Sequence, residues 1–127
     1  MNFSFNPTEG PVIVLTKLRG PAGELVVRLA LDTGATTSLL SWETAALLGY
    51  DPSADKTRVR VTTGSGVEFA PRILIDKIEA LGTERINFPI LCHTLPPSAG
   101  VDGVLGLDFL RGQRVILDFR SGLLTVD

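Results

Sequence analysis

The residue that points most clearly to chemistry is an aspartate at the end of an apolar segment. Asp32 follows Leu25–Leu31, and after it the residues are small or hydroxylated as far as Ser38. Asp followed closely by Gly is also an ordinary turn signal, in which the carboxylate only accepts hydrogen bonds from nearby amides. The apolar segment favours a functional role, because a buried strand would deliver the carboxylate towards an interior rather than to a surface bend.

A carboxylate in this place needs a partner if it is to act as both acid and base. Thr33 and Gly34 are small and allow a second backbone to approach closely. A two-fold axis would bring Asp32 face to face with Asp32 of a second, identical chain. Two carboxylates about 3 Å apart share one proton, so the ionised one accepts a proton from water and the neutral one donates to a carbonyl oxygen. Such a pair works without a metal, a cofactor or a covalent intermediate.

Other residues offer weaker sites. Asp102 is the in-chain rival for a second catalytic carboxylate, but no Thr follows it, and we interpret it as a turn residue. Cys92 and His93 are the only cysteine and the only histidine. A Ser or Cys hydrolase would depend wholly on His93, and structural zinc normally needs several Cys or His ligands, so we expect neither. Asp108 is interpreted as complementing the start of a helical turn.

The elements that must position Asp32 are mostly strands. Apolar and β-branched runs bounded by Gly and Pro predict strands at residues 12–18, 25–31, 57–63, 67–69, 72–78, 86–92, 115–119 and 123–126. The first two predict a hairpin buried on both faces, since they are almost continuously apolar. Ser41 is expected to cap a short helix that Gly49 ends, and another helical turn is expected over Asp108–Gly112. The pattern predicts an all-β fold with one or two short helices.

Length and composition restrict the class of protein. The chain has 127 residues, which fits one domain spanning 1–127. Hydrophobic residues make up 44% and charged residues 20%, the balance of a soluble globular protein. A net charge of −2 without a Lys or Arg cluster argues against a nucleic-acid partner, and no apolar run is long enough to span a bilayer. The N-terminal residues lack the features of a signal peptide, so we expect a cytoplasmic location and no membrane partner.

Three segments together resemble a known family. LDTGATTSLL, the glycine-tipped hairpin VTTGSGVEF and GVLGLDFL resemble, in order and spacing, the retropepsin-like aspartic proteases, the single-lobe class related to retroviral proteases. The match runs from about Val12 to Val126. The last segment and the hairpin after it also resemble the protease-like domain of ubiquitin-receptor shuttle proteins and bacterial relatives. The resemblance implies a closed β-barrel that functions as a C2 homodimer on peptide or protein substrates.

The resemblance also implies roles for the matching residues. Asp32 would be the catalytic carboxylate, Thr33 would join the two active-site loops across the dimer axis, and Gly34 would offer its carbonyl to the substrate backbone. The other matching residues would form the flap, line the substrate pockets or support the Asp32 loop: Thr63, Gly64, Ser65, Gly66, Ala35, Thr36, Val104, Leu105 and Gly106. No metal and no cofactor are implied.

Some positions depart from the retroviral pattern. Retroviral members carry acidic residues just after Asp-Thr-Gly-Ala and a basic residue just after the apolar-apolar-Gly run, where this chain has Thr36, Thr37 and Leu107. The charged clamp between these segments is therefore absent. An obvious terminal strand pair for dimerisation is also lacking, and Leu123–Val126 is the strand that we expect to pair between subunits.

Two functions from different classes follow. The first is a homodimeric aspartic endopeptidase, in which one Asp32 from each subunit activates the water that hydrolyses a peptide bond. The second is a catalytically weak or inactive dimer on the same fold, which binds extended peptides or joins larger proteins. The absent charged clamp favours the second function.

Overall fold

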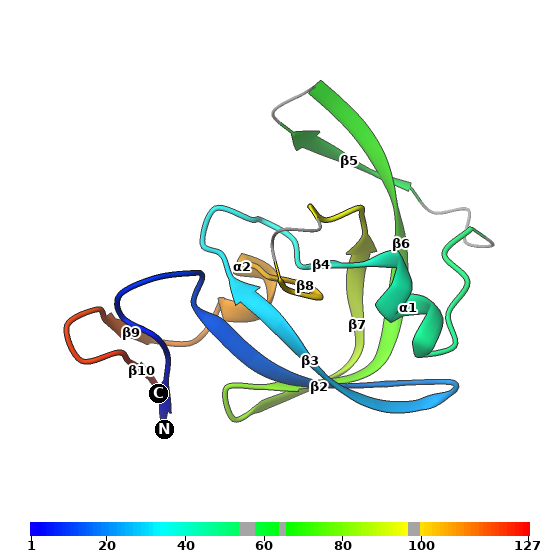
Figure 1. The fold of residues 1–127 in the computed structure, drawn as a ribbon. Coiled ribbons are helices and arrows are strands. Elements are labelled where there is room, and N and C mark those ends of the chain that lie inside the picture. The colour runs from blue at the N-terminus through cyan, green and yellow to red at the C-terminus, as the bar shows by residue number, and fades with distance from the viewer. Residues whose placement is uncertain (54–57, 64–65, 97–99) are drawn as a thin grey trace.

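A computed structural model describes residues 1–53, 58–63, 66–96 and 100–127, without the side chains of Arg58 and Thr63. Strands dominate the described residues, and short helices interrupt them (Figure 1). The elements in order are β1 Asn2–Ser4, β2 Ile13–Gly20, β3 Gly23–Leu31, β4 Leu39–Leu40, α1 Trp42–Leu47, β5 Arg58–Thr63, β6 Gly66–Ala80, β7 Thr83–Cys92, β8 Gly103–Leu105, α2 Leu107–Leu110, β9 Val115–Asp118 and β10 Leu123–Val126. The predicted all-β class with short helices is confirmed.

Six of the strands close into a barrel. They follow the order β2-β3-β8-β4-β7-β6, and an additional pairing between β2 and β6 closes the ring. β5 pairs with β6 and lies outside the ring, so the β5–β6 hairpin extends beyond the barrel wall (Figure 1). The closed barrel that the family resemblance implied is therefore present.

β6 is one long strand where the sequence predicted two short ones. It runs through Pro71 and changes partner there, pairing with β5 up to Pro71 and with β7 from Arg72 onward. Proline cannot donate a ladder hydrogen bond, so it is tolerated where a strand passes from one partner to another. At the predicted break, residues 70–71, β6 changes its pairing partner from β5 to β7 and continues as one strand.

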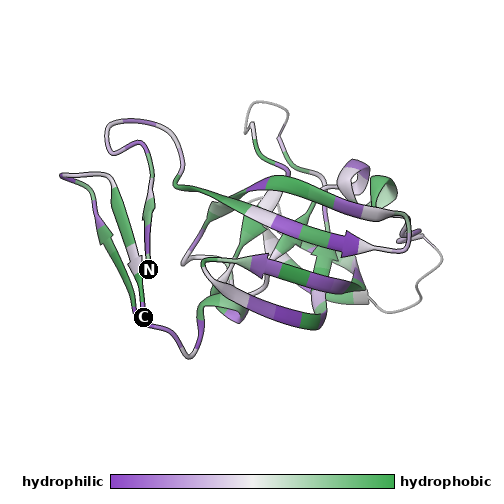
Figure 2. Cartoon of the chain, turned by 90° about the horizontal axis from the view of Figure 1, so that it is seen from below, coloured by the Kyte–Doolittle hydropathy of each residue, from purple (hydrophilic) through white to green (hydrophobic). Residues whose placement is uncertain are grey.

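The β2–β3 hairpin is buried on one face only, which corrects the expectation of burial on both faces. Leu18 and Leu29 are fully buried in the barrel core, whereas Leu15 and Val26 are each 66% exposed. A barrel has only one interior, so alternate residues of each strand face outward even when they are apolar. Figure 2 shows the hydropathy of the barrel strands, along which hydrophobic and hydrophilic residues form bands.

Local signals fix α1 as the sequence predicted. The Ser41 side chain accepts a hydrogen bond from the Thr44 N–H at 3.2 Å, which caps the helix. Gly49 then has φ +92°, a left-handed conformation that suits glycine after a helix. Leu48, between helix and glycine, is fully buried in the core. No helix of the described residues has the length and apolar character needed to cross a membrane.

A second sheet lies to one side of the barrel and holds both ends of the chain (Figures 1 and 2). Its order is β1-β10-β9, and the Met1 ammonium donates to the Val126 carbonyl at 2.8 Å. β10 is the central strand, with both hydrogen-bonding edges occupied by β1 and β9. Leu123–Val126 is therefore not free to pair with a partner subunit, and only β1 and β9 present outer edges in this sheet.

Candidate active site

Asp32 lies directly after β3, where the chain leaves the barrel. Its backbone N–H donates to the Leu105 carbonyl at 3.0 Å, and its Oδ1 accepts from the Gly34 N–H at 2.8 Å. Asp32, Thr33 and Gly34 are exposed in the single chain. The expectation that β3 delivers the carboxylate to an interior is therefore wrong for one chain, because the strand ends before the loop turns outward. The carboxylate is held by its own loop and is accessible.

β8 passes between the two ends of the Asp32 loop. It pairs in parallel with β3 and antiparallel with β4, the strands that lead into and out of this loop. A Cβ on Gly106 would lie 2.6 Å from the Ala35 carbonyl oxygen, so a side chain there would clash with the loop backbone. Beyond it, the Leu107 N–H donates to the same Ala35 carbonyl at 2.8 Å. The structure thus brings Val104, Leu105 and Gly106 beside the Asp32 loop.

Ser38 and Asp108 fasten this arrangement. Ser38 is fully buried; its Oγ donates to Asp108 Oδ1 at 2.7 Å and accepts from the Gly106 N–H at 2.9 Å. The Ser38 N–H also donates to Asp108 Oδ2 at 3.0 Å. The sequence predicted Asp108 only as a helix-start residue and gave no role to Ser38. A hydroxyl–carboxylate link therefore joins the same two segments between which the charged clamp is absent.

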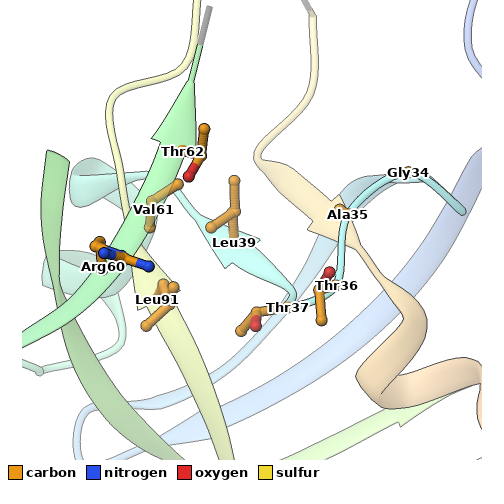
Figure 3. A pocket seen from close by; sticks show the side chains of 9 residues that line it. All are labelled: Gly34, Ala35, Thr36, Thr37, Leu39, Arg60, Val61, Thr62 and Leu91. Carbon is orange, nitrogen blue, oxygen red and sulfur yellow. The ribbon is translucent and has the colours of Figure 1, made fainter. Parts of the chain in front are cut away.

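A pocket of about 500 Å³ lies between the Asp32 loop and β5 (Figure 3). Its lining combines the loop, β4, β5 and β7: Gly34, Ala35, Thr36, Thr37, Leu39, Arg60, Val61, Thr62 and Leu91. Three of the predicted site residues, Gly34, Ala35 and Thr36, are among them. The sequence did not single out Arg60, because its alternation with Val59 and Val61 is also typical of a solvated strand face.

The other predicted site residues lie elsewhere or are not described. Leu105 is fully buried in the core, and neither Leu105 nor Val104 lines this pocket. They do not line the pocket because β8 lies between β3 and β4, at a central position in the sheet. Gly64 and Ser65, the predicted flap tip, lie outside the described residues, as does the side chain of Thr63. The backbone of Thr63 pairs with Gly66 at the end of the β5–β6 hairpin.

Asp102 is not placed to act with Asp32. Its Oδ2 accepts from the Arg28 N–H at 2.8 Å, and its backbone bonds both Arg28 and Ser41. Arg28 precedes Asp32 by four positions along β3, which is roughly 13 Å of strand. Asp102 therefore joins β3 to the start of α1, which agrees with a structural role for this residue.

His93 follows β7 and is bound to the β5–β6 hairpin. Its Nε2 lies 2.6 Å from a Glu68 carboxylate oxygen, and its Nδ1 lies 2.8 Å from the Thr94 carbonyl oxygen. The Glu68 hydrogen bond, followed by that of Thr94, raises the pKa of His93 above its ordinary value, and partial burial opposes the rise. Both ring nitrogens have partners that are not nucleophiles, which argues against a Ser or Cys hydrolase built on His93. No cluster of three or more Cys, His, Asp or Glu within the described ranges could hold a metal.

Comparison with known families decides the assignment. The family model described as aspartyl protease matches residues 18–109, a segment that contains Asp32, Ser38 and Asp108. This chain belongs to the aspartyl protease family. The Asp-Thr-Gly motif at residues 32–34 and the β8 segment that supports it both lie inside the match. No curated protein sequence matches the chain.

Solved structures share its fold. A retropepsin-like aspartic protease from Rickettsia conorii matches with a TM-score of 0.74 at 22% identity, over 99% of this chain and 88% of that chain. The retroviral protease-like domain of Ddi1 from Leishmania major matches with a TM-score of 0.59 at 20% identity, over 94% and 90% of the two chains. The predicted resemblance to retropepsin-like proteases is confirmed at the level of family and fold.

Proposed function

We propose that this protein is an aspartic endopeptidase that acts as a homodimer, with one Asp32 from each subunit. The observation that carries the proposal is the combination of support and exposure at Asp32. The loop is fixed from behind by β8 and by the Ser38–Asp108 link, while the carboxylate is exposed in the single chain. A rigid but open carboxylate is what a site completed by a second copy requires.

The proposed chemistry needs only the two carboxylates and a water. With about 3 Å between them, the two groups hold one proton. The ionised carboxylate takes a proton from water as the water attacks the scissile carbonyl, and the neutral carboxylate donates to the carbonyl oxygen. The tetrahedral diol then collapses, the carbon–nitrogen bond breaks, and a proton moves to the departing nitrogen. Thr33 would hold the two loops together, and the Gly34 carbonyl would accept from the substrate backbone.

The position of the β5–β6 hairpin supports an extended substrate. β5 is the last strand of its sheet, so its outer edge has no strand partner among the described residues. This edge borders the pocket next to Gly34 and Ala35. An extended peptide laid between the hairpin and the Asp32 loop would add main-chain hydrogen bonds to β5 and place alternate side chains in the pocket.

The test is cleavage of a peptide library from acidic to neutral pH by wild-type protein and by two variants. Asp32→Asn should abolish cleavage while the protein stays folded. Asp102→Asn is the matched control, because an Asn oxygen at 102 can still accept from the Arg28 N–H, and it should cleave as the wild type does. Cleavage by Asp32→Asn at the wild-type rate would refute the proposal.

The second candidate is a dimeric module that binds extended peptides without cleaving them. The observation that favours it is the neutral pair Thr36 and Thr37, with Leu107 opposite, in the place of the retroviral charged clamp. Such a protein would bind library peptides with equal affinity before and after Asp32→Asn and release no products. A statine-type transition-state mimic separates the two functions, since only a working dyad binds it much more tightly than a plain peptide.

A further inference from the structure

The described lining of the pocket beside the Asp32 loop has one charged side chain, Arg60, and no opposite charge. Among the residues that the structure describes, Arg60 is the only ionisable one in its lining, and none of the described carboxylates lines the pocket. Arg60 is exposed, and it forms no ion pair with any of the described residues. Arginine remains protonated at all relevant pH values and pairs with carboxylates through two parallel hydrogen bonds. The pocket is thus open to an anionic group of matching size.

Hydroxyl groups on the facing wall add to this preference. Thr36 and Thr37 lie across the pocket from Arg60 (Figure 3). Neither hydroxyl has a hydrogen-bond partner in the part of the chain that the structure describes, so each can donate to a ligand oxygen. Leu39 and Leu91 supply apolar surface between the two walls. An Asp or Glu side chain combines the matching features, a short apolar stem and a terminal carboxylate.

The hairpin places Arg60 where a bound peptide would meet it. Arg60, Val61 and Thr62 are consecutive residues of β5, and all three line the pocket along the outer edge of the strand. A peptide paired with that edge would direct every second side chain to the same side. One of them would enter the space between Arg60 and the Asp32 loop.

We infer that this pocket selects substrates with an acidic side chain, Asp or Glu, at one position near the scissile bond, through an ion pair with Arg60. The inference rests on the proposed protease function and names its substrate class. An apolar side chain resting on Leu39 and Leu91 is the competing occupant, and it would be indifferent to the charge of Arg60.

The experiment begins with the library peptide that the wild-type protein cleaves best. Each residue around the scissile bond is replaced in turn by Glu, Gln, Leu or Lys, and kcat/KM is measured for each peptide. At one position the peptide with Glu should have a kcat/KM about tenfold higher than the peptide with Gln, the range expected for a hydrogen-bonded charge pair. Arg60→Gln should remove this difference, and Arg60→Glu should turn the preference towards Lys. Arg120→Gln, a change of an exposed arginine on the β9–β10 turn, is the matched control and should leave the preference intact.

Binding keeps this test separate from the test of proteolysis. If the wild-type protein cleaves no peptide, or if cleavage survives Asp32→Asn, the proposed protease function is refuted. Peptide binding to the pocket can still be measured in either case. The affinities of the Glu and Gln peptides for Asp32→Asn protein should then differ by the same factor and become equal after the added Arg60→Gln change. The inference would be overturned if no peptide position prefers Glu over Gln in cleavage or in binding. It would also be overturned if a preference for Glu persists in Arg60→Gln.

Discussion

Ser38 and Asp108 are 70 residues apart in the sequence and are joined by two hydrogen bonds, from Ser38 Oγ to Oδ1 at 2.7 Å and from Ser38 N to Oδ2 at 3.0 Å. Ser38 belongs to the loop that begins at Asp32, and Asp108 belongs to α2. The Gly106 N–H donates to the same Ser38 hydroxyl at 2.9 Å. The loop that carries the catalytic candidate and the segment behind it are therefore held as one unit.

Replacing Ser38 with Ala should destabilise the protein and weaken the site. The change removes one hydroxyl that donates to Asp108 and accepts from Gly106, and it leaves the buried Gly106 N–H without a partner. An unsatisfied buried group of this kind costs about 2 kcal/mol. Urea denaturation should show that loss in the free energy of unfolding, and kcat should fall below that of the wild type. Ser4→Ala changes an exposed residue of β1 and should alter neither stability nor kcat. Equal stability of the Ser38→Ala and Ser4→Ala variants would contradict the prediction.

Replacing Gly106 with Ala should displace the Asp32 loop. The new Cβ would lie 2.6 Å from the Ala35 carbonyl oxygen and 3.1 Å from the Thr37 carbonyl carbon, both backbone atoms that cannot rotate away. Overpacking of this kind costs about 1–3 kcal/mol. Cleavage should be lost with only partial loss of stability, measured by thermal unfolding. Gly10→Ala separates backbone strain from this clash, because Gly10 has φ +75° but nothing lies within 4 Å of its Cβ; it should lose some stability and keep its activity. Full activity of Gly106→Ala would contradict the close approach.

Features with local causes were predictable from the sequence. The cap Ser41 and the stop Gly49 predict α1 because both act on the residues next to them. β4 at Leu39–Leu40 has no such signal, because it exists only through its pairing with β7 and β8. The outward face of β2 and β3 was also missed, since apolar residues such as Leu15 and Val26 face solvent once the barrel closes.

The same division applies to the site. Asp32 and its neighbours form a contiguous motif, so a single stretch of sequence indicated them. The Ser38–Asp108 link was not predictable, because its partners meet only when β8 enters the sheet between β3 and β4. Arg60 gave a pattern that strand alternation explains equally well, and only the pocket shows where its charge lies. Residues that act through distant neighbours need the fold before their role can be seen.

The pair of His93 and Glu68 should make stability depend on pH. The raised pKa of His93 means that the folded state favours the protonated ring, chiefly through its hydrogen bond with Glu68. This contribution is complete below the unfolded pKa of about 6.5 and is lost as pH rises through the folded pKa. The side chains are 23% and 49% exposed, so screening limits the effect to about 0.5 kcal/mol.

Thermal unfolding at pH 6 and pH 9 checks this prediction with His93→Gln as the variant. The wild type should be more stable than His93→Gln at pH 6, and the two should approach each other at pH 9. Glu68→Gln should give the same pattern, because it removes the other partner of the same hydrogen bond. If the stability difference between wild type and His93→Gln instead grows as the pH rises, the prediction is contradicted. Cleavage should persist in His93→Gln, since both ring nitrogens are occupied away from Asp32.

Mixing subunits tests the shared site directly. If each site takes one Asp32 from each chain, a wild-type chain paired with an Asp32→Asn chain has a single carboxylate and cannot share a proton between two. Adding an equal amount of Asp32→Asn protein should therefore lower the activity of a fixed amount of wild type to about half after subunit exchange, because random pairing leaves half of the wild-type chains with a wild-type partner. Asp102→Asn protein, added in the same way, should not lower the activity of the mixture. Undiminished activity in the Asp32→Asn mixture, with exchange verified by labelled subunits, would mean that each chain works with its own carboxylate alone.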